Sequence, residues 1–388
     1  MNSDVEKTLP EGWKYVQLGD LSEYINGYTF KSKDWSNKGL PIIRIQNLNG
    51  KDEYNYFESE IKEKYKVFNG DILISWSASL DVYYWQGGDA VLNQHIFNTK
   101  INTEIITKEF FYHTIKYSLA EISRNLHGMG LKHITKGKFE RILSPLPPIE
   151  EQKRIVTKID TLFAKIDKSI TLTEESIVQA KNLFTSSLSE IFNELKSSYK
   201  TYPLMKYVNF VGGSQPPKST FSYEKKKGYV RLIQIRDYKT DNHIVYINEN
   251  STKKFCEKND IMIGRYGPPV FQILRGLKGA YNVALMKAIP IESKVDSEFL
   301  FYFLQNSNIQ RYIISISQRS AGQSGVNKKA LDAYSISLPP LGVQTKLVVV
   351  FNQLKNHTQQ TQSKLEEQLA YLKQLKSSIL SKAFKGEL

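Results

Sequence analysis

The sequence contains a single cysteine, Cys256, among 388 residues. One thiol cannot form an internal disulfide or a Cys-rich zinc site, so we expect a protein of a reducing compartment. The sequence also lacks any run of roughly 18 uncharged apolar residues, which a membrane-spanning helix would need. Its first residues show neither the basic nor the apolar segment of a secretion signal. We therefore expect a cytoplasmic protein with no membrane partner.

Catalytic motifs are missing as well. The sequence has no GxxxxGK[ST] or GxGxxG loop for a nucleotide, no HExxH pair for zinc, and no Asp/Asn/Ser-Pro-Pro-aromatic motif of an adenine methyltransferase. Its six histidines show no paired ligand spacing apart from His127 and His133. One carboxylate and lysine set, Asp52, Glu60 and Lys62, could suggest a nuclease. We nevertheless predict no catalytic, cofactor-binding or metal-binding residue, and hence no enzyme activity of the chain by itself.

Positive charge, in contrast, is abundant. Lys and Arg number 53 against 39 Asp and Glu, which gives a net charge of +14 with neutral histidines. This excess indicates a polyanionic partner, although its sign alone does not separate nucleic acid from an anionic membrane. The length predicts two or three domains, each able to bury its own core.

The chain is an internal repeat. Residues 146–192 align without gaps to residues 338–384 at an offset of 192, and 14 of the 47 positions are identical. Upstream, IRIQNL from Ile43 matches IQIRDY from Ile233, and GDILIS from Gly70 matches NDIMIG from Asn259. Two copies of one unit are therefore predicted, each with a variable part followed by a better preserved part.

The better preserved parts, residues 147–200 and 339–388, read as long helices. Each begins at a Pro-Pro pair, and neither Pro nor Gly occurs from Ile149 to Lys200 or from Val343 to Lys385. About 47 residues would span roughly 70 Å of helix. We predict a helix-helix seam and a second stripe that packs on a variable part of the chain or on a partner. The seam residues are Ile155, Ile159, Leu162, Ile166, Leu347, Phe351, Leu354, Leu365, Leu372 and Ile379, and the stripe is Phe163, Ile170, Ile177, Phe184 and Ile191.

The variable parts, residues 1–146 and 201–338, combine two kinds of pattern. Short β-branched runs such as GDILIS and NDIMIG predict strands. Apolar residues at helical spacing follow in 108–125 and 297–318. The fold class is therefore mixed α/β, or α+β, in the order mixed domain, long helix, mixed domain, long helix.

Several of these segments resemble one known family. They are LPEGWKYVQLGDL (9–21), IRIQNL, GDILIS, PLPPIEEQKRIVTKIDTLF (145–163) and SSILSKAFKGEL (377–388). Together they resemble the specificity subunit of a type I restriction-modification system. The resemblance implies two target recognition domains, each reading one half of a bipartite, asymmetric DNA site, and an antiparallel coiled coil of the two long helices.

The same resemblance implies partners. Double-stranded DNA would be bound by the chain, and two modification subunits would dock on it and methylate adenine with S-adenosylmethionine. Restriction subunits would join with ATP and Mg²⁺ for cleavage. No cofactor is implied for the chain itself.

For contacts to bases or phosphates we select polar residues that follow the predicted strands or lie in the loop after the predicted helix, because Arg, Asn and Gln can pair with base edges. In the first domain these are Arg44, Gln46, Asn47, Trp76, Ser77, Gln94, His95, Arg124, Asn125, His127, Lys132 and His133. In the second they are Gln234, Arg236, Asp237, Arg265, Tyr266, Arg319, Gln323 and Ser324.

Other interpretations remain open at this point. Trp76 could belong to the core, His95 could be an interior histidine, and the basic run Lys225–Lys227 could be a solvated face rather than a phosphate contact. For the whole chain, the alternatives are an autonomous DNA-cleaving enzyme that uses Asp52, Glu60 and Lys62, and a coiled-coil scaffold that does not bind DNA.

Overall fold

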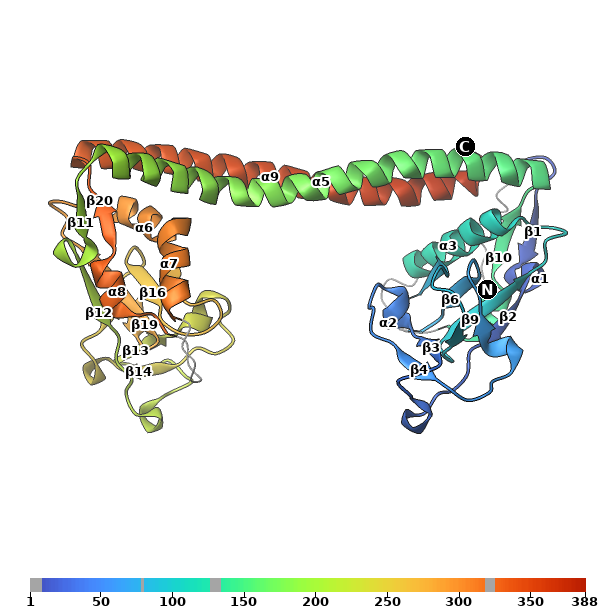
Figure 1. Ribbon diagram of the computed structural model, residues 1–388, viewed down its shortest axis with the longest axis horizontal. Helices are drawn as coiled ribbons and strands as arrows, with labels where there is room; N and C mark the ends of the chain where they lie inside the picture. The colour runs from blue at the N-terminus through green and yellow to red at the C-terminus, as the bar shows by residue number, and fades with distance from the viewer. Residues whose placement is uncertain (1–8, 78–79, 126–133, 318–324) are drawn as a thin grey trace. The chain divides into compact units, whose positions relative to one another are not determined.

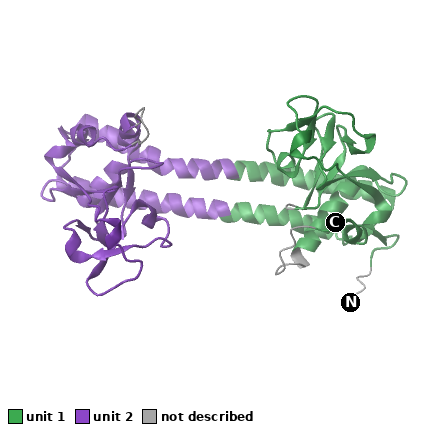
Figure 2. Ribbon diagram, turned by 90° about the horizontal axis from the view of Figure 1, so that it is seen from below, with its two compact units in different colours: residues 1–173, 367–388 green, residues 174–366 purple. Residues whose placement is uncertain are grey.

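The computed structural model describes residues 9–77, 80–125, 134–317 and 325–388, which divide into two compact units (Figures 1 and 2). Unit 1 comprises residues 1–173 and 367–388, and unit 2 comprises residues 174–366. Each unit therefore combines one variable part with segments of both long helices. The four consecutive segments that we delimited from the sequence describe the order along the chain and remain a prediction.

In its described residues, unit 1 contains two four-stranded sheets and one two-stranded sheet. Their orders are β2-β9-β6-β7, β4-β3-β8-β5 and β1-β10, and every pair is antiparallel except β3 with β8. The strands are β1 (Lys14–Gln17), β2 (Ser22–Asn26), β3 (Leu40–Ile43), β4 (Asn55–Phe57), β5 (Lys66–Val67), β6 (Ile72–Ser75), β7 (Asp81–Tyr84), β8 (Ala90–Leu92), β9 (Ile96–Ile101) and β10 (Leu143–Leu146). The short helices are α1 (Leu18–Leu21), α2 (Ile45–Leu48), α4 (Lys136–Glu140) and the 3₁₀ turns η1 (Ser32–Asp34) and η2 (Glu63–Tyr65), and α3 (Lys108–Asn125) is the longer helix.

Unit 2 repeats this topology. Its sheets are β12-β19-β16-β17, β14-β13-β18-β15 and β11-β20, again with one parallel pair, β13 with β18. The strands are β11 (Thr201–Pro203), β12 (Val208–Gly212), β13 (Tyr229–Ile233), β14 (Tyr246–Asn248), β15 (Phe255–Cys256), β16 (Ile261–Gly264), β17 (Gln272–Leu274), β18 (Gly279–Tyr281), β19 (Leu285–Pro290) and β20 (Ser335–Ser337). The helices are α6 (Ser297–Gln305), α7 (Ser307–Ser317), α8 (Lys328–Ala333) and the 3₁₀ turns η3 (Leu204–Lys206), η4 (Lys218–Thr220), η5 (Ile235–Tyr238) and η6 (Glu249–Ser251).

The two long helices are α5 (Ile149–Ser198) and α9 (Leu341–Ala383). Within unit 1, Arg154 of α5 donates a hydrogen bond to the carbonyl of Leu388, and Asp167 of α5 forms an ion pair of 2.7 Å with Lys376 of α9. Residue numbers thus rise along one helix as they fall along the other. The helices are antiparallel, and with the mixed units they confirm the fold class that the sequence predicted.

The predicted seam is buried where each helix meets its unit. Ile155, Ile159 and Ile166 of α5 lie in unit 1, and Phe351 of α9 lies in unit 2. Leu162, Leu347, Leu354, Leu365, Leu372 and Ile379 are half-buried. Burial is strongest at the helix segments beside a mixed domain, because these segments face a sheet-and-helix core as well as the other long helix.

Three residues of the second stripe pack against the mixed domains. In unit 1, Phe163 contacts His113 of α3, with ring centres 6.0 Å apart. In unit 2, Phe184 contacts Tyr302 of α6 at 6.0 Å, and Ile191 packs on the same core. Ile177 is buried and Ile170 is half-buried.

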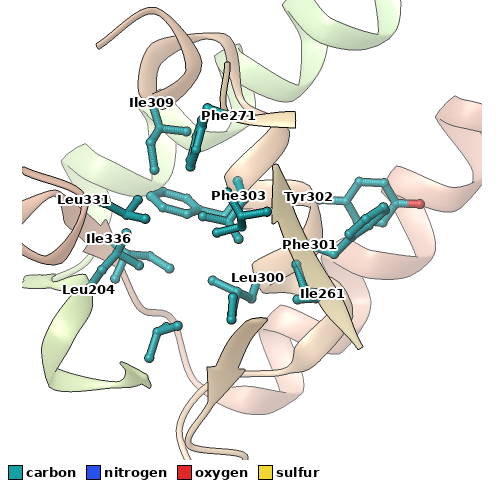
Figure 3. Close-up of a cluster of buried hydrophobic side chains, with 14 of the residues drawn as sticks. Leu204, Ile261, Phe271, Leu300, Phe301, Tyr302, Phe303, Ile309, Leu331 and Ile336 are labelled. Atoms are coloured by element: carbon teal, nitrogen blue, oxygen red, sulfur yellow. The ribbon is translucent and has the colours of Figure 1, made fainter. Parts of the chain in front are cut away.

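The core of unit 2 gathers side chains from every layer (Figure 3). Leu300 and Phe303 of α6 lie among Leu331, Ile336 and Leu204, all of them buried. Phe192 of α5 packs on Phe303 and on Phe351 of α9. Unit 1 has the corresponding core, in which Phe384 at the end of α9 stacks on Tyr117 of α3. Each mixed domain thus receives the start of one long helix and the end of the other.

Candidate nucleic-acid interface

The candidate residues of unit 1 follow strands that end at one edge. Strands β3 and β8 are parallel, with Ile43 opposite Leu92, so the residues after them emerge side by side. Strand β6 is antiparallel to β9, with Ser75 opposite Ile96, which brings the end of β6 to the turn before β9. The end of β2 meets β9 in the same way, with Asn26 opposite Phe97. We call residues 27–31, 44–49, 76–77 and 93–95 loop cluster 1.

Backbone hydrogen bonds hold loop cluster 1 together. The Asn93 N–H donates to the Ile43 carbonyl at 3.1 Å, and the Tyr28 N–H donates to the Leu92 carbonyl at 2.7 Å. The Trp76 N–H reaches the His95 carbonyl at 3.4 Å. The loops are thus joined to one another as well as to their own strands.

Unit 2 builds the same arrangement, which we call loop cluster 2: residues 213–217, 234–239, 265–266 and 282–284. Ile233 lies opposite Tyr281 in the parallel pair, and the Asn282 N–H donates to the Ile233 carbonyl at 3.1 Å, as Asn93 does in unit 1. The Arg265 N–H donates to the Ala284 carbonyl at 2.8 Å. The backbone frame is therefore the same in both clusters, while most of the side chains differ.

One glycine in each cluster permits the close approach of two loops. A Cβ built on Gly27 would lie 2.2 Å from the Leu92 carbonyl oxygen, and one on Gly213 would lie 2.1 Å from the Asn282 carbonyl oxygen. Real Cβ atoms do not come this near to backbone oxygen. Any side chain here would push the loop after β2, or after β12, away from its neighbour.

Two candidate residues point inward. Asn47 is 8% exposed and Asp237 is 4% exposed. The Asn47 Oδ1 accepts the Arg44 N–H at 3.0 Å, and the Asp237 Oδ2 accepts the Gln234 N–H at 3.2 Å. Both side chains therefore hold their own turn in place, and the exposed neighbours on that turn are better placed to meet a ligand.

Asn47 and Asp237, the buried anchors of the two turns, make different further contacts. The Asn47 Nδ2 donates to the carbonyls of Lys51 and Glu53, each at 2.9 Å. The Asp237 carboxylate instead pairs with Arg231 at 3.4 Å. Burial raises the pKa of the Asp237 carboxyl, against the opposing effects of the Gln234 N–H and the Arg231 guanidinium.

The remaining residues of loop cluster 1 divide between surface and core. Gln46 and His95 are exposed, so the interpretation of His95 as an interior histidine is wrong. The Gln94 Oε1 accepts a hydrogen bond from Thr29 at 2.6 Å, and its Nε2 lies 3.3 Å from the His95 Nε2. Polar groups from three loops thus gather at this edge.

Trp76 has one side in the core and one at the cluster. Its ring stacks on Phe97 at 5.7 Å and lies 5.5 Å from the His95 ring. Its buried Nε1 has no hydrogen-bond partner among the described residues. Ser77, directly after it, is half-buried.

Loop cluster 2 places a guanidinium where loop cluster 1 has the tryptophan. The Arg265 Nη1 donates to the Val283 carbonyl at 3.2 Å, and the guanidinium lies 5.2 Å from the centre of the Tyr266 ring. Gln234 is half-buried and Arg236 is exposed. Both basic side chains therefore lie on the loops of one cluster.

The other sequence candidates follow a helix rather than a strand. Arg124 and Asn125 are the last residues of α3. His127, Lys132, His133, Arg319, Gln323 and Ser324 lie outside the described residues. The lysines of the run Lys225–Lys227 are exposed.

Sequence reasoning missed an aromatic group that lies partly within loop cluster 1 and partly beside it. Tyr28 lies 5.0 Å from Phe30 and 5.4 Å from Tyr65 between ring centres, and the Arg44 guanidinium lies 4.5 Å from the Trp35 ring. The signal was the repeat itself, because aligning Gly27 with Gly213 would have marked the segment after each glycine as part of the site.

The described residues show neither a metal-binding cluster nor a membrane-spanning helix. Within the described ranges, no group of three or more His, Cys, Asp or Glu residues is arranged to hold a metal ion. Asp52, Glu60 and Lys62 are exposed. No helix in the described part of the chain is long and apolar enough to cross a membrane.

The chain is a duplicated fold in which the same backbone frame carries different side chains in each loop cluster. The family described as "Type I restriction modification DNA specificity domain" matches residues 10–177 and 198–371, one match per copy. The chain belongs to this family and is a specificity subunit of a type I restriction-modification system. Membership of this family, together with similarity to the named subunits described next, means that the chain recognises DNA and has no catalytic activity of its own.

The chain is similar to two subunits from Escherichia coli over 98% of its length. The type I restriction enzyme EcoBI specificity subunit is 25% identical, with 87% of that protein covered, and the EcoKI specificity subunit is 24% identical, with 90% covered. The fold matches the crystal structure of the HsdS subunit from Thermoanaerobacter tengcongensis with a TM-score of 0.59, at 21% identity and 98% coverage of both chains. It also matches a chain from a structural study of assembly and conformational transition in the type I R-M system, with a TM-score of 0.76 at 21% identity, covering 98% of this chain and 100% of the other.

Proposed function

We propose that each unit reads one half of a bipartite, asymmetric site in duplex DNA through its loop cluster. The observation that carries this proposal is the shared backbone frame with exchanged side chains: Asn93 and Asn282 make the same hydrogen bond, while Trp76 is replaced by Arg265. A constant frame places its side chains at equivalent depths in a groove. Different side chains there favour different bases.

The second part of the proposal concerns partners. The two helix entries, at Pro147 and Pro339, share the Pro-Pro pair and the same hydrogen bond from a buried glutamine, which supports two related docking sites for two copies of one partner. Their surface residues differ, because Gly342 and Val343 replace the acidic pair Glu150 and Glu151. We assign these partners as modification subunits that methylate adenine, with restriction subunits joining them. S-adenosylmethionine, ATP and Mg²⁺ belong to the partners in this scheme, and the protein works on DNA in the cytoplasm.

The third part assigns a spacing role to the helices. Helix α5 runs for 50 residues without interruption, which corresponds to about 75 Å. One turn of duplex is roughly 34–36 Å. We propose that the helix length sets the number of base pairs between the two half-sites.

The test is a domain exchange in the assembled complex. Residues 18–142 are replaced by the same segment of a relative with a different site, and methylated adenines are mapped by single-molecule sequencing. We expect the sequence of one half-site to change, while the sequence of the other half-site and the number of base pairs between them stay the same. A change in both halves would refute independent reading. In a separate variant, one heptad is deleted between Ser169 and Ser176, and an unchanged gap would refute the spacing role.

The alternatives make different predictions. A scaffold that does not bind DNA would show negligible affinity for duplex at any salt concentration. We expect binding that weakens steeply with salt, because phosphate contacts release counterions. A nuclease would lose cleavage by the purified chain when Glu60 is replaced by Ala, whereas we expect the purified chain not to cut DNA at all.

A further inference from the structure

The turn that follows the parallel strand has the same construction in both units. In unit 1, β3 ends at Ile43 and α2 follows at once, and in unit 2, β13 ends at Ile233 and η5 follows. The fourth residue of each turn is the buried anchor, Asn47 or Asp237, and it accepts the N–H of the first residue. A hydrogen bond to a buried side chain therefore fixes the backbone of each turn. The side chains at the other positions of the turn are not needed for this bond and can differ.

Burial along the two turns is the same residue by residue. The first position, Arg44 or Gln234, is half-buried, and the third position, Gln46 or Arg236, is exposed. The second position is isoleucine in both, Ile45 and Ile235, and it packs on the local core. Only the first and third positions can therefore present a polar side chain to a ligand.

These two positions carry the same pair of side chains in opposite order. Unit 1 has Arg44 and then Gln46, and unit 2 has Gln234 and then Arg236. Arg pairs through two hydrogen bonds with the O6 and N7 atoms of guanine, and Gln pairs in the same way with the N6 and N7 atoms of adenine. The transposition thus exchanges two base preferences on one unchanged backbone.

The third position is the better placed of the two. The Arg44 guanidinium already lies over the Trp35 ring at 4.5 Å. No hydrogen bond or ion pair joins the Gln46 or Arg236 side chain to another described residue, and both face solvent. The neighbouring turns at Asn93 and Asn282 are bonded to the strand end itself, so the exposed side chain projects from a rigid edge.

We propose that Gln46 and Arg236 are specificity-determining residues, with Gln46 reading an adenine in one half-site and Arg236 a guanine in the other. This inference rests on the proposed DNA recognition and adds which residues choose which base. The buried anchors Asn47 and Asp237 act as positioning residues, because they fix the turn without reaching the groove.

The experiment exchanges the two side chains one at a time in the full complex with its modification subunits. Gln46→Arg adds a positive charge, and its control is Asp52→Asn, which raises the net charge equally at a nearby exposed site. Arg236→Gln removes a charge, and its control is Lys253→Gln, which removes a charge at an exposed site of unit 2 outside loop cluster 2. Bound sequences are selected from duplexes in which both half-sites are randomised, and the thermal midpoint of each variant confirms that it is folded.

We expect Gln46→Arg to change one position of one half-site from adenine to guanine, and Arg236→Gln to change one position of the other half-site from guanine to adenine. Each exchange should alter the preference by roughly ten- to hundred-fold. Loss of preference at that single position would also support the inference, whereas the controls should change affinity and salt dependence only.

Three outcomes would overturn the inference: unchanged half-sites, a change at several positions of both halves, or an effect equal to that of the charge-matched control. The proposed function is judged separately on the unmodified complex. If that complex selects no bipartite sequence, DNA recognition itself fails; if it does and the exchanges leave the site unchanged, only the assignment of Gln46 and Arg236 fails.

Discussion

Gln152 and Gln344 make the same three hydrogen bonds in the two units. The Gln152 side chain accepts the Thr107 N–H at 2.8 Å and donates to the carbonyls of Ile105 and Pro147, each at 2.9 Å. Gln344 accepts the Asp296 N–H at 2.9 Å and donates to Lys294 and Pro339. Both side chains are fully buried. Each therefore ties the start of a long helix to the loop that leads into α3 or α6.

Replacing Gln152 with Ala should destabilise the protein by about 2–4 kcal/mol, because it removes the partner of three backbone groups, one at the buried Pro147 and two at the half-buried Ile105 and Thr107. The free energy of unfolding in urea measures this cost, and Gln344→Ala should show a similar one. Gln179→Ala, on the exposed face of α5, is the control and should change stability by less than about 0.5 kcal/mol. Equal effects at Gln152 and Gln179 would contradict the role of this residue at the helix start.

The end of the chain should be required for the core of unit 1. Phe384 is 1% exposed, and it stacks on Tyr117 at 4.6 Å and lies 5.1 Å from Phe110. Phe384→Ala should cost about 3–5 kcal/mol, the usual cost of emptying a buried phenylalanine site. Thermal unfolding would report the loss. Tyr371→Ala, at an exposed position of α9, is the control. A thermal midpoint of Phe384→Ala as high as that of Tyr371→Ala would refute the prediction.

A methyl group at Gly27 should disturb one loop cluster and spare the other. Gly27→Ala places a Cβ against the Leu92 carbonyl, so the loop after β2 must shift. We expect at least ten-fold weaker selection at one half-site, and Gly213→Ala should act on the other half-site. Gly137→Ala is the control, because its Cβ would meet no atom within 4 Å. The structural explanation fails if Gly27→Ala leaves the selected sequence intact.

Stability should fall on mild acidification because of His113. Burial lowers the pKa of His113, against the raising effect of the Asp160 carboxylate, while the Lys116 and Lys376 ammonium groups lower it further. The folded state then binds fewer protons than the unfolded state below about pH 6.5, so the free energy of unfolding decreases as pH falls through this range. The slope contributed is at most about 1.4 kcal/mol per pH unit.

Urea unfolding from pH 7.5 to 5.5 measures this slope, and His113→Gln should flatten it. His357→Gln is the control, since His357 is exposed on α9. If the free energies of unfolding of the unmodified protein and of His113→Gln differ by a constant amount over this pH range, His113 is not the group that titrates.

Much of the architecture could be predicted because it depends on local periodicity. The Pro-Pro pairs at 147–148 and 339–340 and the long stretches without Pro or Gly predicted helices over 147–200 and 339–388. The helices of the structure run over Ile149–Ser198 and Leu341–Ala383. The runs GDILIS and NDIMIG, predicted as strands, contain β6 and β16. The chain leaves the strand at Ile43 and Ile233, because Asn47 and Asp237 capture the backbone N–H three residues before them and close a helical turn.

The loop clusters could be predicted only in part. Gln46, His95, Arg236 and Arg265 were selected for chemistry and position after a strand, and they do lie on the loops of the clusters. Asn47 and Asp237 were selected for the same reason, yet their side chains turn inward. Nothing in the local pattern distinguishes the two groups, since the direction of each side chain depends on carbonyls contributed by other turns.

The amino-acid sequence by itself determined the duplication, the long helices and their apolar faces, because periodicity and repeat spacing are properties of the linear chain. Tertiary structure alone decided which loops meet, which of their polar side chains are used internally, and that Phe384 completes a core begun more than 250 residues earlier. These features depend on strand order and on contacts between distant segments. Local sequence encodes neither, because each contact is favourable only when the rest of the unit is in place.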